Sequence, residues 1–195
     1  YDPYNFDASS LEATLTTAAG ETVTGYPQGF LNRKTQWISP EPDNVNQAIA
    51  LTQGLIPNLG LAMTSTVSGG TINLEVRTKF SKNFSNLKLV VYVLENGLIY
   101  DQHNYTEYYN GADIIEDFEH NHVLRASLTP LLGETVSNSE TSINSTYTRT
   151  FNVPVPANVA NAANLEFVAF IVDENGNAIN VRNAEAGETQ EFEQI

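Results

Sequence analysis

Alternation of apolar and polar residues, which begins near Leu59, constrains the fold of this chain more than any other feature of its sequence. In TINLEVRTKF the side chains expected on one face of a strand are Ile72, Leu74, Val76, Thr78 and Phe80. This period of two is typical of a strand with one buried face. Turn signals separate such stretches: an SGG, and the pairs Asn96–Gly97 and Asn175–Gly176, which suit two-residue hairpin loops. About seven such strands predict an antiparallel β-sandwich of immunoglobulin-like type.

The residues before this region have mixed α/β character. DASSLEATLTTAAG predicts a short helix that Asp7 or Ser9 caps, and DNVNQAIALTQGLIP predicts a second helix that ends at Gly54 and Pro57. Between them, TGYPQGFLNRK is typical of a turn that leads into a short strand. The sequence therefore predicts a mainly β fold with an α/β segment at residues 1–58 and a sandwich at residues 59–195.

Charge and cysteine content exclude several classes of function. With 9 Lys and Arg against 23 Asp and Glu, the formal net charge is −14, which repels nucleic acid and anionic membrane surfaces. The chain contains no Cys, so it has no disulfide, no thiolate nucleophile and no cysteine zinc site of its own. No apolar run is long enough to span a bilayer as a helix.

Two histidines in the stretch EHNHVLRASL raise the question of a metal site. On a continuous strand, His120 and His122 would share one face and Arg125 would lie on the other. A metal would need further ligands in a defined geometry. We therefore interpret the pair as structural and predict neither a metal nor a cofactor. We expect Arg125 to pair with a carboxylate or to bind exposed carbonyls.

A long segment rich in tyrosine and carboxylates precedes that stretch. Its tyrosines are Tyr100, Tyr105, Tyr108 and Tyr109. Tyrosine combines apolar area with a hydrogen-bonding tip, which suits contact with a protein or a glycan. The alternative is that these side chains cover an edge of the sheet. The sequence has no G-x-S-x-G and no H-E-x-x-H motif, so we predict no catalytic residues.

EHNHVLRASL, followed by Gly133–Glu134, resembles the signature of the outer membrane protein 28 family of Bacteroides-type bacteria. GYPQGFLNRK in turn is similar to the cis-proline segment of a thioredoxin-like fold, with Pro27 at the cis position. The resemblance implies an exported protein of the outer membrane, cell surface or periplasm, held at the membrane only through an upstream lipid anchor. It also implies that residues 1–58 correspond to the C-terminal half of a thioredoxin-like domain.

These features favour a non-catalytic module of the cell envelope that acts in binding or adhesion, with an unidentified protein or glycan as its ligand. One alternative is the C-terminal part of a thiol–disulfide oxidoreductase whose dithiol lies upstream of this chain. A third is a structural role, in which the sandwich self-associates through an exposed edge strand.

Overall fold

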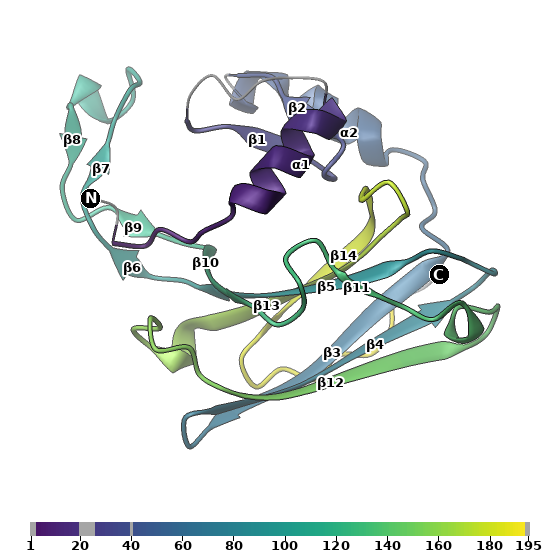
Figure 1. The fold of residues 1–195 in the computed structure, drawn as a ribbon. Coiled ribbons are helices and arrows are strands. Elements are labelled where there is room, and N and C mark those ends of the chain that lie inside the picture. The colour runs from purple at the N-terminus through teal and green to yellow at the C-terminus, as the bar shows by residue number, and fades with distance from the viewer. Residues whose placement is uncertain (1–2, 20–25, 40, 194–195) are drawn as a thin grey trace.

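The protein consists of two packed antiparallel sheets with a small α/β segment on the outer face of one of them (Figure 1). The structure is a computed structural model, and it describes residues 3–19, 26–39 and 41–193. The first sheet has the order β10-β5-β13-β14, and β11 also pairs with β5. Its strands are β5 (Lys88–Glu95), β10 (Val123–Ser127), β11 (Glu134–Thr135), β13 (Leu165–Val172) and β14 (Ala178–Glu185).

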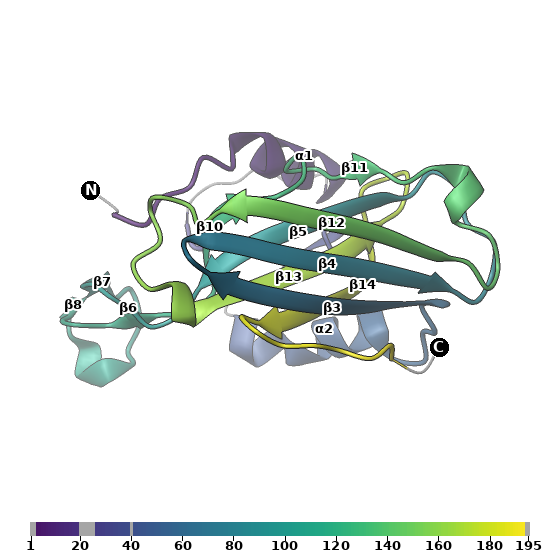
Figure 2. The same ribbon diagram turned by 90° about the horizontal axis from the view of Figure 1, so that it is seen from below.

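The second sheet has the order β12-β4-β3, and its three strands lie side by side in Figure 2. They are β3 (Leu59–Ser68), β4 (Thr71–Phe80) and β12 (Thr146–Pro154). Every side chain that the alternation assigned to the inner face of β4 is buried, from Ile72 to Phe80. These side chains pack against Phe167 and Val91 of the first sheet. The mainly β sandwich predicted from the sequence is therefore confirmed.

Both faces of the first sheet are covered, which explains why β5 reads as a nearly continuous apolar run. On its outer face, Val90, Phe170 and Val172 form a second buried cluster beneath the N-terminal segment. The guanidinium carbon of Arg33 lies 4.6 Å from the centre of the Phe170 ring. Arg33 also bonds to the hydroxyl of Tyr92 and, at 3.1 Å, to the carbonyl of Leu131. This arginine attaches the N-terminal segment to the sandwich.

The N-terminal segment contains two helices and a small hairpin. Its elements are α1 (Ser9–Ala19), β1 (Gly29–Leu31), β2 (Thr35–Trp37), the 3₁₀ turn η1 (Glu41–Asn44) and α2 (Val45–Thr52). Asp7 accepts a hydrogen bond from the backbone N–H of Ser9, as expected for the start of α1. The Tyr26–Pro27 peptide bond is cis, in agreement with the expectation for Pro27. The thioredoxin-like origin of this segment and the boundary at residue 58 stay predictions.

The C-terminal residues close one open edge of the sandwich. Ser65 donates its backbone N–H to the carbonyl of Glu188, and Gln190 donates its own to the carbonyl of Met63. The buried Gln190 side chain accepts from the N–H of Met63 and donates to the carbonyl of Asn183 on β14. The C-terminal segment thus joins β3 of one sheet to β14 of the other.

An arm extends from the end of β5 and projects away from both sheets (Figure 1, left). It is a narrow antiparallel ribbon of two short strand pairs, β6 with β9 and β7 with β8. Its elements are β6 (Leu98–Ile99), β7 (Gln102–His103), the turn η2 (Tyr109–Gly111), β8 (Ile114–Ile115) and β9 (Glu119–His120). Two further 3₁₀ turns, η3 (Asn138–Glu140) and η4 (Ala162–Asn164), lie in loops of the sandwich.

The hairpin predicted at Asn96–Gly97 is wrong, because the chain enters the arm at this turn. β5 pairs with strands of the first sheet whereas β6 pairs with β9, so this turn joins two elements that do not pair with each other. At Asn175–Gly176 the hairpin itself is confirmed, because β13 and β14 pair, but five residues connect them instead of two. Asp173 holds this loop in shape, since its Oδ1 accepts the backbone N–H groups of Asn175 and Asn177.

Candidate functional site

The two histidines do not share one face of a strand, which overturns the expectation for His120 and His122. The strand is broken between them, because His122 has a left-handed backbone with φ of 57°. His120 lies on β9, where its Nε2 donates to the carbonyl of Tyr100 at 3.0 Å. His122 instead points its Nδ1 to Glu166 at 2.8 Å. Within the described residues, no group of three or more His, Cys, Asp or Glu side chains could hold a metal.

Glu166 is the centre of a polar cluster at the base of the arm. Its side chain is 6% exposed, and it accepts hydrogen bonds from Asn183, Asn96 and His122 at 2.7, 3.1 and 2.8 Å. Burial alone would raise the pKa of this carboxyl group. The hydrogen bonds from Asn183, Asn96 and His122 outweigh burial, so the pKa of Glu166 lies below its ordinary value. The cluster therefore holds an ionised carboxylate.

The asparagines of this region fix the turn from which the arm begins. Asn96 Oδ1 accepts the backbone N–H of His122 at 2.7 Å, and Asn121 Oδ1 accepts that of Gly97 at 2.8 Å. Each asparagine thus binds the backbone of the opposite segment, so the connection into the arm and the connection out of it are held together. Gly97 has φ of 70°, and a Cβ there would lie 3.2 Å from the side-chain nitrogen of Asn164. Both the backbone conformation and the limited space therefore favour glycine in this turn.

A buried ion pair lies at the same base, between Glu95 at the end of β5 and Arg125 on β10. Nε of Arg125 is 3.1 Å from Oε2 of Glu95, and the two side chains are 5% and 0% exposed. The other oxygen of Glu95 accepts the backbone N–H groups of Ala160 and Asn161 at 2.8 and 2.6 Å. Of the two partners expected for Arg125, a carboxylate or exposed carbonyls, the structure has a carboxylate, that of Glu95.

Tyr4 covers this base from the N-terminal segment. The guanidinium carbon of Arg125 lies 5.6 Å from the centre of the Tyr4 ring. The same ring packs edge-on against His120 at 5.8 Å and Tyr100 at 6.1 Å, and its hydroxyl donates to the carbonyl of Ile99. A residue from the start of the described chain thus contacts both strands of the arm and the buried arginine.

The four candidate tyrosines all lie on the arm, but they do not converge on one pocket. Tyr100 is at the base against Tyr4, whereas Tyr109 packs edge-on against Phe118 and Tyr105 stacks on His103. Exposure increases from 45% at Tyr100 to 58% at Tyr109, 67% at Tyr108 and 83% at Tyr105. They therefore form an exposed surface of the arm.

Asn104 holds the tip of the arm in shape. Its Nδ2 donates to the carbonyls of Tyr108 and Ala112, and its Oδ1 accepts from the N–H and the hydroxyl of Thr106. Tyr109 and Asn110 both have left-handed backbones, with φ of 56° and 58°. The tip is thus an organised turn that presents the tyrosine side chains outward.

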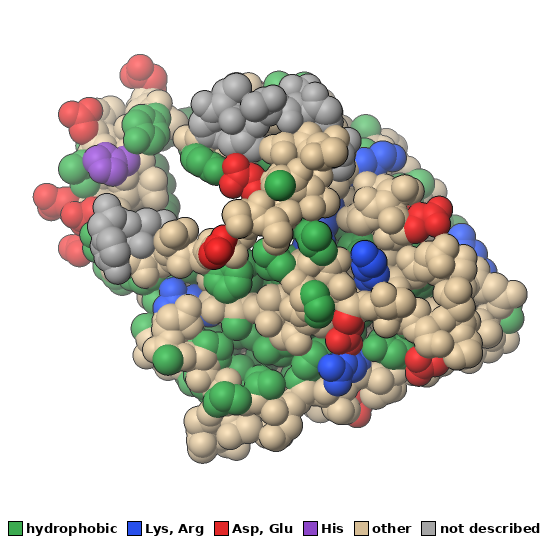
Figure 3. All heavy atoms as spheres, in the orientation of Figure 1, with side chains coloured by type: hydrophobic (Ala, Val, Ile, Leu, Met, Phe, Trp, Pro, Cys, Tyr) green, Lys and Arg blue, Asp and Glu red, His purple; other side chains and the backbone are tan. Residues whose placement is uncertain are grey.

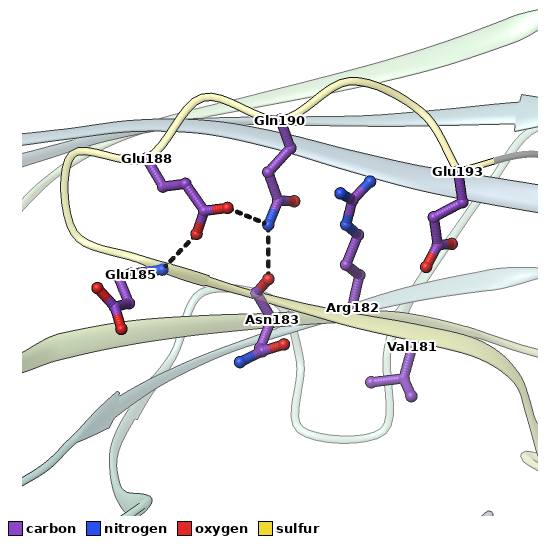
Figure 4. Close-up of a pocket in the computed structure, with 7 residues that line it drawn as sticks. All are labelled: Val181, Arg182, Asn183, Glu185, Glu188, Gln190 and Glu193. Atoms are coloured by element: carbon purple, nitrogen blue, oxygen red, sulfur yellow. Dashed lines mark hydrogen bonds between the residues drawn. The ribbon is translucent and has the colours of Figure 1, made fainter.

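A polar cleft of about 630 Å³ lies elsewhere, between β14 and the C-terminal segment (Figure 4). Its polar side chains largely bond to one another or to the backbone. Gln190 donates to Glu188, Glu188 accepts the N–H of Glu185, and Arg182 donates to the carbonyls of Leu61 and Glu191. These contacts attach the C-terminal segment to the sandwich, so the arm and its base remain the candidate site.

Sequence reasoning missed Tyr4, Glu95, Asn96 and Glu166 as members of the site. Glu95 and Glu166 carried a usable signal, because each is an acidic residue in an otherwise apolar strand, VVYVLE and LEFVAF. A charged residue in such a position is rarely buried unless it is paired. Tyr4 carried no comparable signal.

Comparison with known proteins gives one family and a few similar structures. The family model of outer membrane protein Omp28 matches residues 16–190. HBP35 of Porphyromonas gingivalis is similar, with a TM-score of 0.67 and 17% identity. The alignment covers 95% of this chain and 60% of the HBP35 chain. Protein AGR_C_4864 of Agrobacterium tumefaciens is similar with a TM-score of 0.51 and 13% identity, over 100% of this chain and 77% of its own.

A domain of the outer membrane lipoprotein Omp28 of P. gingivalis aligns with a TM-score of 0.43 and 18% identity, over 70% of this chain and 93% of that domain. A search of curated proteins finds no match. The chain spans about 60% of the length of HBP35, and the likeness to HBP35 and AGR_C_4864 shows the fold. Among the described residues, no helix is both long and apolar enough to cross a bilayer.

Removing one partner of the buried ion pair should destabilise the protein strongly. We expect Arg125→Met to lower the free energy of unfolding by about 3–5 kcal/mol, because it leaves the Glu95 carboxylate buried without its cation. The matched control is Arg149→Met, which breaks the more exposed pair with Glu134 and should cost at most about 1 kcal/mol. Urea denaturation of both variants measures the difference, and equal losses would contradict the role of Arg125.

Stability should depend on the ionisation of Glu166. Its pKa is lowered in the folded protein, so the stability it contributes is complete above the ordinary glutamate pKa and is lost as the pH falls through the lowered value. In thermal melts between pH 7 and pH 3, Glu166→Gln should be less stable than wild type at pH 7, and the difference should shrink toward pH 3. The control Glu191→Gln should follow the wild-type profile. A constant difference at every pH would show that the charge of Glu166 does not matter.

Proposed function

The chain belongs to the family of outer membrane protein Omp28, and from that premise we propose that it is a non-catalytic binding module of the cell envelope whose contact surface is the arm of residues 98–120. The observation that carries this proposal is the set of exposed tyrosines at the tip of the arm, Tyr105, Tyr108 and Tyr109. Large aromatic side chains that remain in water are typical of surfaces that contact another molecule.

The attachment of the arm supports the same function. Its base is held by the Glu166 cluster and by Tyr4, and its tip is held by Asn104. A binding surface that is fixed in advance loses less conformational entropy when a partner binds. An arm whose only role was to cover the sheet edge would have its tyrosines packed against that edge, whereas here the arm projects away from both sheets (Figure 1).

A non-catalytic role agrees with how the buried charges are used. Glu95 and Arg125 neutralise each other, and Glu166 already accepts three hydrogen bonds. These groups act in positioning the arm. The oxidoreductase alternative depends on a dithiol outside this chain, which contains no Cys, and it stays a prediction. Self-association through an edge strand also stays a prediction, and light scattering at several concentrations measures it.

Truncating the exposed tyrosines should remove binding and leave the fold intact. We expect Tyr105→Ala combined with Tyr108→Ala to weaken binding about tenfold or more, since aromatic anchors dominate contact energies. The melting temperature should change little, because exposed substitutions cost about 0.5 kcal/mol or less. The probes are a glycan array and an array of host extracellular proteins, screened first with the wild-type chain.

The matched control for this test is Tyr26→Ala, which removes an equally exposed tyrosine from the N-terminal segment. It should bind like wild type to whichever array spots the wild-type chain recognises. If the array signals of the wild-type chain persist in the double variant, the arm is not the contact surface. A large fall in melting temperature would show instead that the tyrosines serve in packing.

A further inference from the structure

We propose that the partner of the arm is a cationic, arginine-rich protein segment that lies along the ribbon of residues 98–120. This inference rests on the proposed function, since it names the chemistry of the molecule that the arm binds. Three separate observations support the proposal: the charge of the arm, the arrangement of its aromatic rings and the spacing of its carboxylates.

The charge of the arm is of one sign only. Residues 98–120 contain six carboxylates and neither Lys nor Arg: Asp101, Glu107, Asp113, Glu116, Asp117 and Glu119. Both strands and the tip contribute to this set, and acidic side chains gather over the arm in the space-filling view (Figure 3). Such a surface attracts a cationic partner over a distance and repels an anionic one. Charge complementarity therefore favours a basic partner.

Aromatic rings form a continuous row from the tip of the arm to its base. Tyr109 contacts Phe118 at 6.3 Å, Phe118 contacts His120 at 5.0 Å, and His120 contacts Tyr4 at 5.8 Å between ring centres. Tyr100 extends the row at 6.1 Å from Tyr4. The faces of aromatic rings attract cations, and the planar guanidinium of arginine stacks on them well.

The protein itself shows that this row accepts a guanidinium. The side chain of Arg125 lies with its guanidinium carbon 5.6 Å from the centre of the Tyr4 ring, at the base of the row. Further along the arm, the exposed Tyr105, Tyr108 and Tyr109 offer the same kind of ring. The exposed Glu107 lies between Tyr105 and Tyr108 in the chain. An incoming arginine can therefore contact a ring and a carboxylate at once.

The spacing of the carboxylates favours an extended partner over a metal ion. They are spread along the ribbon, and the described residues include no group of three or more potential ligands close enough to hold a metal. A chain with several cationic side chains can reach many of these groups together. We therefore assign the surface to a protein segment with several arginines.

The test measures the binding of a fluorescently labelled octa-arginine peptide by fluorescence anisotropy at two salt concentrations. Octa-lysine and a Gly/Ser octapeptide serve as comparison probes. Octa-arginine should bind more tightly than octa-lysine, and the Gly/Ser peptide should not bind. Neutralising three exposed carboxylates of the arm with Glu107→Gln, Asp113→Asn and Glu116→Gln should weaken octa-arginine binding about tenfold. Higher salt should weaken it further.

The matched control separates the arm from the overall charge of −14. Glu140→Gln, Glu185→Gln and Glu191→Gln remove the same charge from exposed positions outside the arm and should change binding less than about threefold. Equal weakening by both triple variants would overturn the proposal, because binding would then follow net charge alone. Absence of octa-arginine binding would overturn it too.

These outcomes are distinguishable from failure of the proposed function. If an array ligand that carries no positive charge binds the wild-type chain and is lost in the Tyr105→Ala, Tyr108→Ala variant, the arm is a contact surface and the cationic partner is wrong. If octa-arginine binding is lost with the arm carboxylates and also falls in that tyrosine variant, both inferences stand. If neither array binding nor octa-arginine binding responds to any arm variant, both fail.

Discussion

The buried pair of Glu95 and Arg125 is the interaction on which the position of the arm depends. One oxygen of Glu95 is used by the backbone of Ala160 and Asn161, and the other faces Arg125, so a single carboxylate joins β5, β10 and the loop before β13. Desolvating two charges is costly, and their attraction compensates only while the geometry is kept. The pair therefore favours one arrangement of these segments at the point where the arm begins.

A second carboxylate acts on the opposite face of the same sheet. In the antiparallel register Glu95 lies opposite Leu165, and its neighbour Leu94 lies opposite Glu166, so the two acids point to opposite faces. Glu166 holds Asn96 and His122, which lie in the two segments that lead into and out of the arm. The base of the arm is thus fixed from both faces of the sheet, while its exposed tyrosines and carboxylates remain available to a partner.

The sandwich could be predicted from the sequence because strand periodicity is a local signal, as the burial of Ile72 to Phe80 shows. The arm could not be predicted, because each of its paired strands has only two residues, too few to show an alternation of apolar and polar side chains. The break at His122 depends on contacts with Asn96 and Glu166, which lie 26 and 44 residues away in the chain. A local pattern predicts no such contact, so from the sequence alone the histidines are expected on one continuous strand.

Amide hydrogen exchange on the arm tests most directly whether its base holds it in one conformation. The N–H groups of Tyr100 and Asn104 bond across the ribbon to the carbonyls of Phe118 and Asp113. We predict that both amides are protected in the wild-type chain, and that Arg125→Met releases them while amides at the centre of β4 stay protected. Wild-type arm amides that exchange as fast as an unstructured peptide would contradict the account, because the arm would then have no fixed surface to present.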